Sequence, residues 1–466
     1  MLLLWSAVDL CSGRYMFAGV VRNGISSMAQ DALGNEVSRA SDATLKGIDD
    51  FVDGFLGYEK KAINVVAAAD AEPDSVLANA YAGIIWMLAE AEGATRMASR
   101  YLARAQAAEA GANVRERMIV AQLERWIADD VPAVQAIGEE LARQYPRDLA
   151  SVKLHQYFSF NRGDATNMLR IARAVERENG HNPHIHGMLA FGHEQMHELE
   201  AAEQAARRAL SLKAKEPWAQ HALAHVMLGQ GRVAEGVAFL AEAQQTWVGL
   251  NSFMYTHNWW HKALFHISQG DEAAVFDAYD NHVWGIEPDQ PQDQVGAVSL
   301  LARMEVAGLD VGNRWEDVAA YLGSRGEDTT LPFLTLQYLY GLARAERDEA
   351  DRLMRAVEER AATTTGWDRV VWREVALPAA RGVLAHARRD FAGAVRWLTV
   401  ANPRMTEIGG SHAQRDLFSQ LLLDAHLKLG NWAIARQMLE MRRIWDPDGV
   451  PVNRALALVN QKLATA

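Results

Sequence analysis

Cysteine is almost absent from the 466-residue sequence, because Cys11 is the single one. One thiol excludes an internal disulfide and any zinc or iron–sulfur site built from several cysteines. Basic residues are also in deficit, with 47 Lys and Arg against 59 Asp and Glu and a formal net charge of −12. Because nucleic acids and anionic membrane surfaces attract clustered positive charge, we expect no nucleic-acid partner and no membrane-surface binding.

Long apolar runs are missing as well. No uncharged apolar stretch reaches the length of about 18 residues that a membrane span needs, so we expect no membrane span. The start of the chain is apolar but lacks the basic residues of a signal peptide, and Asp9 interrupts it. We therefore expect residues 1–30 to form an N-terminal arm or helix that packs on the body of the protein. The single cysteine fits a reducing compartment, so we expect a cytoplasmic protein.

Alternating β-branched runs are scarce, and apolar residues instead recur at three and four positions, which predicts an all-α protein. An internal repeat of 34 residues relates Pro183 to Pro217 and Ala202 to Gly236. This period is typical of tetratricopeptide (TPR) units, in which small residues let two helices of a hairpin approach closely. The sequence predicts a TPR-like α-solenoid of helical hairpins, with TPR units near 183–250.

The best interruption of the helical pattern is the segment 285–293, in which Pro288 and Pro291 forbid a continuous helix. We interpret it as a loop between an N-terminal helical-repeat half, residues 31–284, and a C-terminal half, residues 294–466.

Histidines are concentrated in the middle of the chain, where twelve of the fifteen lie between His155 and His282. Residues four apart share one face of a helix. The repeat register places His221 and His225, the pair His257 and His261, and also His184, on the concave surface of the solenoid. Several imidazoles are therefore expected to converge on one groove. The candidate catalytic residues are His221, His225, His257 and His261.

Imidazole is suited to proton transfer near neutral pH, and two such pairs can also bind zinc or another transition metal. We assign no metal ligand and no required cofactor, and a divalent metal stays an open alternative. The competing interpretation is that these imidazoles are hydrogen-bonded residues of the core or groove.

Two further segments are candidates for ligand binding. Between the second histidine pair lie Asn258, Trp259 and Trp260, and aromatic side chains with polar tips suit a small-molecule pocket, although tryptophan more often fills a core. Far along the chain, Gln414, Arg415 and Asp416 follow a Gly-Gly-Ser turn. They either hold a polar ligand or form a structural Arg–Asp network. We hypothesise that residues 409–416 close over the histidine-lined groove.

Four stretches of the chain resemble the tetratricopeptide repeat protein 38 family. They are Trp218–His225 with its His-Ala-Leu-Ala-His core, His257–His261 with the hairpin through Asp280, Val311–Val318, and Ile408–Phe418. The resemblance implies an all-helical, soluble, repeat-built protein. It implies no reaction, substrate or catalytic residue.

Two classes of function remain open. The first is a TPR-repeat binding protein whose His/Trp-lined concave groove holds a peptide, a protein segment or a small ligand. The second is an enzyme whose enclosed His/Arg/Asp pocket performs general acid–base hydrolytic chemistry, with or without a metal, on a small anionic substrate. The oligomeric state stays open.

Overall fold

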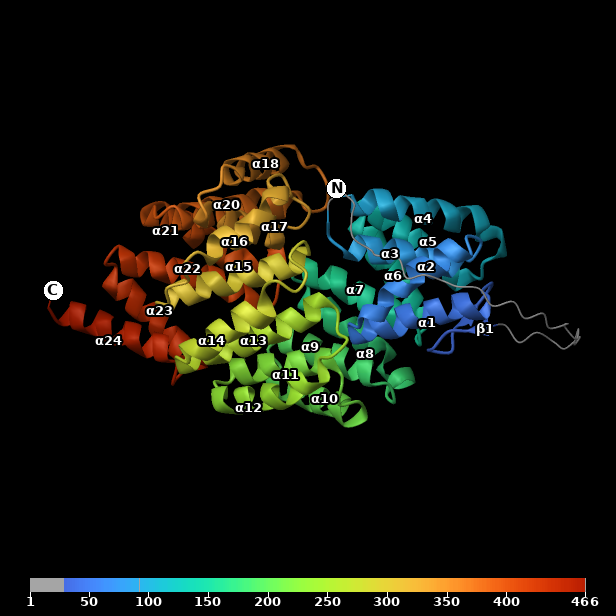
Figure 1. Ribbon diagram of the computed structural model, residues 1–466, viewed down its shortest axis with the longest axis horizontal. Helices are drawn as coiled ribbons and strands as arrows, with labels where there is room; N and C mark the ends of the chain where they lie inside the picture. The colour runs from blue at the N-terminus through green and yellow to red at the C-terminus, as the bar shows by residue number, and fades with distance from the viewer. Residues whose placement is uncertain (1–28, 92, 466) are drawn as a thin grey trace, which may run out of the picture.

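The computed structural model describes residues 29–91 and 93–465, and helices dominate this part of the chain (Figure 1). The α-helices are α1 (Asp42–Gly57), α2 (Asn64–Ala71), α3 (Val76–Leu88), α4 (Ala94–Ala108), α5 (Val114–Ile127), α6 (Val131–Gln144), α7 (Leu149–Asn161), α8 (Ala165–Asn179), α9 (Pro183–Gln195), α10 (Leu199–Leu212), α11 (Pro217–Gly229), α12 (Val233–Ala243), α13 (Ser252–Gln269), α14 (Glu272–Ala278), α15 (Pro291–Val306), α16 (Arg314–Leu322), α17 (Pro332–Arg344), α18 (Glu349–Thr363), α19 (Arg369–Val371), α20 (Leu377–Ala387), α21 (Phe391–Ala401), α22 (His412–Lys428), α23 (Trp432–Trp445) and α24 (Val450–Ala464). The prediction of an all-α protein is confirmed.

Shorter segments complete the secondary structure. Short 3-10 turns are Lys60–Ile63, Glu109–Gly111, Gln244–Thr246, Gly323–Arg325 and Asn402–Ile408, and π-helical turns are Tyr279–Val283 and Trp372–Ala376. The strands β1 (Ala29–Gln30) and β2 (Glu36–Val37) form one small antiparallel pair. Of the expected N-terminal arm, residues 1–30, only Ala29 and Gln30 fall within the described residues.

The 34-residue repeat corresponds to two successive helical hairpins. Pro183 and Pro217 occupy the first positions of α9 and α11, where a proline loses no hydrogen bond. The short turns before α10 and α12 fold each hairpin, and α9 packs against both α10 and α11. Gly236 on α12 shows why a small residue recurs, because a Cβ atom there would lie 2.3 Å from the ring of Phe265. The TPR-like α-solenoid is confirmed.

The solenoid turns back on itself, so that its C-terminal helices contact its middle repeats. Helix α24 packs against α13, α22 packs against α15, and Figure 1 shows α23 and α24 beside α13 and α14. Ser268 Oγ donates a hydrogen bond to Asp446 Oδ1 at 2.6 Å, and His412 Nε2 lies 3.1 Å from the carbonyl oxygen of Gln195. At the other end, Trp367 Nε1 donates to the carbonyl oxygen of Asp129 at 3.0 Å.

The expected break near residues 285–293 is present but shorter, because α15 already begins at Pro291. The largest buried apolar cluster contains residues from Trp260 to Ala425 and continues across this break. Helices α13 and α14 therefore share their core with α15 and the helices that follow. The division into halves 31–284 and 294–466 remains a proposal. Because the buried cluster crosses the break, the boundary does not separate two hydrophobic cores.

Within residues 29–91 and 93–465, no helix combines the length and the apolar character that crossing a bilayer requires.

We expect Gly409→Ala to weaken the contact between the two ends of the solenoid. Gly409 has φ +85°, and a Cβ atom there would lie 2.9 Å from the carbonyl oxygen of Asn161 on α7. A left-handed backbone with a side chain costs on the order of 1–3 kcal/mol, and the steric clash adds to that cost. Gly285→Ala is the matched control, because Gly285 also has φ +85° but nothing lies within 4 Å of the place that a Cβ atom would take. Urea unfolding should show a larger loss for Gly409→Ala, and equal losses would contradict the close contact.

Candidate functional site

Four imidazoles meet between α11 and α13, and we call His221, His225, His257 and His261 the histidine cluster. The Nε2 atom of His221 lies 3.1 Å from Nε2 of His225 and 3.1 Å from Nε2 of His257. The Nε2 atoms of His257 and His261 lie 3.2 Å apart. The predicted convergence of these two i,i+4 pairs is thus present in the structure.

The histidine cluster lies among aromatic rings and away from solvent. Trp218 stacks on His221 with a centroid distance of 4.5 Å, and Trp260 stacks on His257 at 5.3 Å. Burial lowers the pKa of His257 to about 3 and lowers the pKa values of His221 and His261 well below their usual range. These three imidazoles are therefore neutral at physiological pH, and each keeps one nitrogen lone pair.

Glu194 joins the histidine cluster to helix α22. His225 Nδ1 lies 3.2 Å from Glu194 Oε1. Burial raises the pKa of Glu194, but the opposing effects of His225 and His412 are together larger and hold the pKa below its usual value. Glu194 is therefore ionised, and it sits where α9, α11 and the start of α22 meet.

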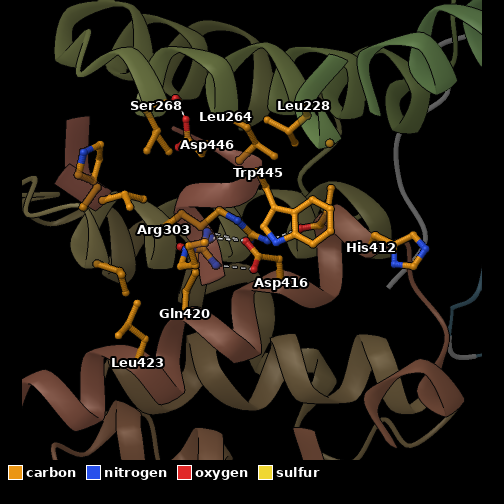
Figure 2. A pocket seen from close by; sticks show the side chains of 18 of the residues that line it. Leu228, Leu264, Ser268, Arg303, His412, Asp416, Gln420, Leu423, Trp445 and Asp446 are labelled. Carbon is orange, nitrogen blue, oxygen red and sulfur yellow. Dashed lines mark hydrogen bonds and ion pairs between the residues drawn. The ribbon is translucent and has the colours of Figure 1, made fainter. Parts of the chain in front are cut away.

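Beside the cluster, a cavity of about 340 Å³ lies between the middle repeats and the returning helices α22–α24. Figure 2 shows Leu228 and Leu264 on one side and Leu423 on another, with Arg303 and Asp416 between them. Glu194, His225 and His412 also line this cavity. The hypothesis that the segment 409–416 approaches the histidine-bearing helices is consistent with this arrangement.

An ion-pair network forms the polar part of the cavity wall. Asp416 accepts two hydrogen bonds from Arg442, at 2.6 and 3.0 Å (Figure 2). Burial alone would raise the pKa of Asp416, but Arg442 and then Arg303 lower it to about 2. Asp416 therefore belongs to an Arg–Asp network, but its partner is Arg442 and not the Arg415 that the sequence interpretation paired with it.

Arg303 differs from Arg442 in its partners. Its guanidinium donates to Ser299 Oγ at 2.5 Å and to the carbonyl oxygen of Ala413 at 2.5 Å, so it ties α15 to the first turn of α22. Burial lowers its pKa to about 10, and the more distant Asp416 opposes that shift. Among the described residues, no carboxylate lies within 4.0 Å of the Arg303 guanidinium.

The structure separates the three candidate residues on α22. Only Asp416 lines the cavity. Gln414 completes a capping box with Ser411, and Arg415 donates to the carbonyl oxygen of Gly410 and lies against His412. Gln414 and Arg415 thus hold the start of α22 in place.

The remaining candidate residues are His184, Asn258, Trp259 and Trp260. His184 is outside the histidine cluster, with Nδ1 3.0 Å from Glu216 Oε1. Trp259 stacks on His282 at 3.6 Å, so it points away from Trp260, which packs on His257. Asn258 is fully buried, and its side-chain amide has no hydrogen-bond partner in the described part of the chain.

Sequence reasoning missed Arg303 and Arg442. Arg303 does carry a recognisable signal, because it is a single cation within the apolar run Ala297–Met304. A buried cation in such a run requires polar partners from elsewhere in the fold. Arg442 lies near the polar end of α23, whose sequence pattern is that of a surface helix. It therefore carries no comparable signal.

No family model matches the chain. The Naa15/Naa10 complex bound to HypK-THB is a similar solved structure, with 12% identity, 91% of this chain and 67% of that chain covered, and a TM-score of 0.25. Yeast Tom70 is another, with 12% identity, 91% and 89% covered, and a TM-score of 0.34. Similarity at this level does not bear on function. The chain's own helices and cavity define its class, an all-α TPR-like repeat protein with a small cavity between its middle and C-terminal helices.

A second buried cation lies on α7. Lys153 Nζ donates to the carbonyl oxygen of Leu56 at 2.8 Å and lies 3.5 Å from the ring centroid of Tyr58. Burial lowers the pKa of Lys153 to about 7, although the charge of Glu216 acts in the opposite direction. The folded state therefore releases this proton at a lower pH than the unfolded chain does.

We expect the stability difference between the wild type and Lys153→Met to depend on pH. Because an unfolded lysine titrates near 10.4, only the unfolded state binds this proton between about pH 7 and pH 10, and the wild type gains stability as pH rises. The difference in free energy of unfolding should shift in favour of the wild type by about 2 kcal/mol from pH 7 to pH 9. Urea titrations at both pH values measure it, and an unchanged difference would show that the ammonium is not desolvated.

Proposed function

We propose that this chain is a TPR-like binding protein that holds a small amphipathic anion in the cavity beside the histidine cluster. The observation that carries this proposal is Arg303, a buried guanidinium on the cavity wall whose direct partners are neutral oxygens and the ring of Trp260. A carboxylate or phosphate on the ligand would supply the counter-charge.

The size and lining of the cavity support a small ligand. A volume of about 340 Å³ is at the lower end of the range of ligand pockets, which are mostly apolar with a few oriented polar groups. Leu228, Leu264 and Leu423 would contact the apolar part of the ligand. Asp416 is already paired twice with Arg442, which leaves Arg303 as the available cation.

A peptide or a protein segment fits less well than a small molecule. Helices α22–α24 cover the part of the concave surface that carries the histidine pairs. An extended peptide would have to displace contacts such as the hydrogen bond between Ser268 and Asp446.

An enzyme is the second candidate, and one contact favours it. Glu194 and His225 form a carboxylate–imidazole pair on the cavity wall, which is the arrangement that general acid–base hydrolysis of a small anionic substrate requires. Because Nε2 of His225 contacts His221, the imidazole is already engaged on its other side. Binding is therefore the better supported function.

We also propose that the chain belongs with the tetratricopeptide repeat protein 38 family and acts in the cytoplasm. The stretches that carry the resemblance contribute the histidine cluster and the start of α22. Arg314, from the third stretch, pairs with Asp280 of the second at 2.6 Å. The single cysteine supports a reducing compartment.

The binding proposal predicts that filling the cavity abolishes ligand binding. Leu228→Trp places a large ring in the cavity, whereas Leu210→Trp, on α10 and also partly buried, is the matched control outside it. With a medium-chain fatty acid as the probe, we expect calorimetric affinity to fall by roughly tenfold to a hundredfold in Leu228→Trp and to stay unchanged in Leu210→Trp.

An alkylamine of the same chain length is the charge control. It should bind more weakly than the fatty acid, because Arg303 selects the anion. Equal binding by both variants, or tighter binding of the amine, would contradict the proposal.

A further inference from the structure

Hydrogen bonding among the rings does not account for the histidine cluster. A ring nitrogen has either one in-plane proton or one lone pair. Nε2 of His221 and Nε2 of His257 each take part in two of the three close contacts. Every protonation pattern therefore leaves at least one nitrogen whose single proton or single lone pair must serve two contacts. Poorly satisfied polar groups are costly in such a buried site.

A metal ion removes this conflict for His221, His257 and His261, because each of these three imidazoles then presents a lone pair to the same cation. Zinc–nitrogen bonds of about 2.0–2.1 Å place two nitrogens of a tetrahedral site about 3.3–3.4 Å apart. The separations of 3.1 Å between His221 and His257 and 3.2 Å between His257 and His261 are within about 0.3 Å of that spacing. One nitrogen from each of His221, His257 and His261 lies within 4.8 Å of the other two.

The surroundings also suit a bound cation. Glu194 contacts Nδ1 of His225, and a carboxylate in that position fixes the ring so that Nε2 faces the other imidazoles. The stacked rings of Trp218 and Trp260 hold His221 and His257 in orientation. The positive charge of Arg303 opposes a cation here, and the carboxylate of Glu194 offsets it.

We propose that His221, His257 and His261 bind one divalent transition-metal ion of the zinc class. Imidazole without carboxylate or thiolate ligands selects zinc, copper or nickel over magnesium and calcium, and zinc is the tetrahedral choice. Three protein ligands leave one position of a tetrahedral zinc site open to water or another small ligand. It joins α11 to α13 directly behind the cavity wall. This site is independent of the ligand proposed for the cavity.

The test is zinc binding by the full chain. Metal is removed with a chelator, Zn²⁺ alone is returned in competition with a chromophoric chelator, and bound metal is counted by mass spectrometry. We expect one zinc ion per chain in the wild type and none in His257→Asn or His261→Asn. His155→Asn is the matched control, because His155 is equally buried but lies on α7 outside the cluster, and it should keep the ion.

Glu194→Gln tests the role of the carboxylate beside His225 and should weaken zinc affinity less than the histidine variants do. If the histidine variants do not fold, the wild type still decides the matter. Its unfolding temperature should rise when zinc is returned, and Co²⁺ in its place should show the intense visible bands of a tetrahedral site. No zinc binding by the wild type, or unchanged binding by folded His257→Asn and His261→Asn, would overturn the proposal. Leu228→Trp should keep its zinc, which separates this outcome from that of the cavity.

Discussion

The return of helices α22–α24 onto the middle repeats is the interaction on which the cavity depends. Without it, α9, α11 and α13 would present an open concave face, as stacked hairpins ordinarily do. Arg303 holds the first turn of α22 through main-chain carbonyl oxygens, and Gly409 allows the preceding turn to approach α7 closely. Ser268 and Asp446 add a polar contact at the far end of the same surface. These contacts turn part of the groove into a pocket with walls from the middle repeats and from the C-terminal helices.

The closure also brings two polar centres with different chemistry side by side. The histidine cluster lies among aromatic side chains and contains the neutral rings of His221, His257 and His261. The cavity wall carries the charges of Arg303, Asp416 and Arg442. Glu194 and His225 belong to both, since they contact each other and line the cavity. A change in the orientation of His225 would therefore alter the contacts of a ligand in the cavity. A rigid histidine cluster would in turn keep one wall of the cavity in place.

The local sequence pattern predicted features that lie within one or two helical hairpins. The prolines at 183 and 217 mark the starts of α9 and α11, and the four-residue spacing of the histidines places them on facing helix surfaces. Contacts that form only when the C-terminal helices return to the middle repeats could not be predicted in the same way. Arg442 pairs with Asp416 across the α22–α23 hairpin, but the surface-like pattern around Arg442 does not indicate that role. The packing of Gly409 against Asn161 depends on the same return of the chain. Which of Trp259 and Trp260 faces the cluster depends on the helices around α13.

Cross-linking in solution tests the closure most directly. In a Cys11→Ser background, Ser268→Cys and Asp446→Cys place one thiol on α13 and one beside α23, at side chains that are in contact in the structure. A short bis-maleimide should join them within one chain under native conditions, as peptide mass spectrometry would show, and urea should abolish the link. If both thiols react singly in the native protein and no link forms, the C-terminal helices do not return to the middle repeats and the cavity does not exist.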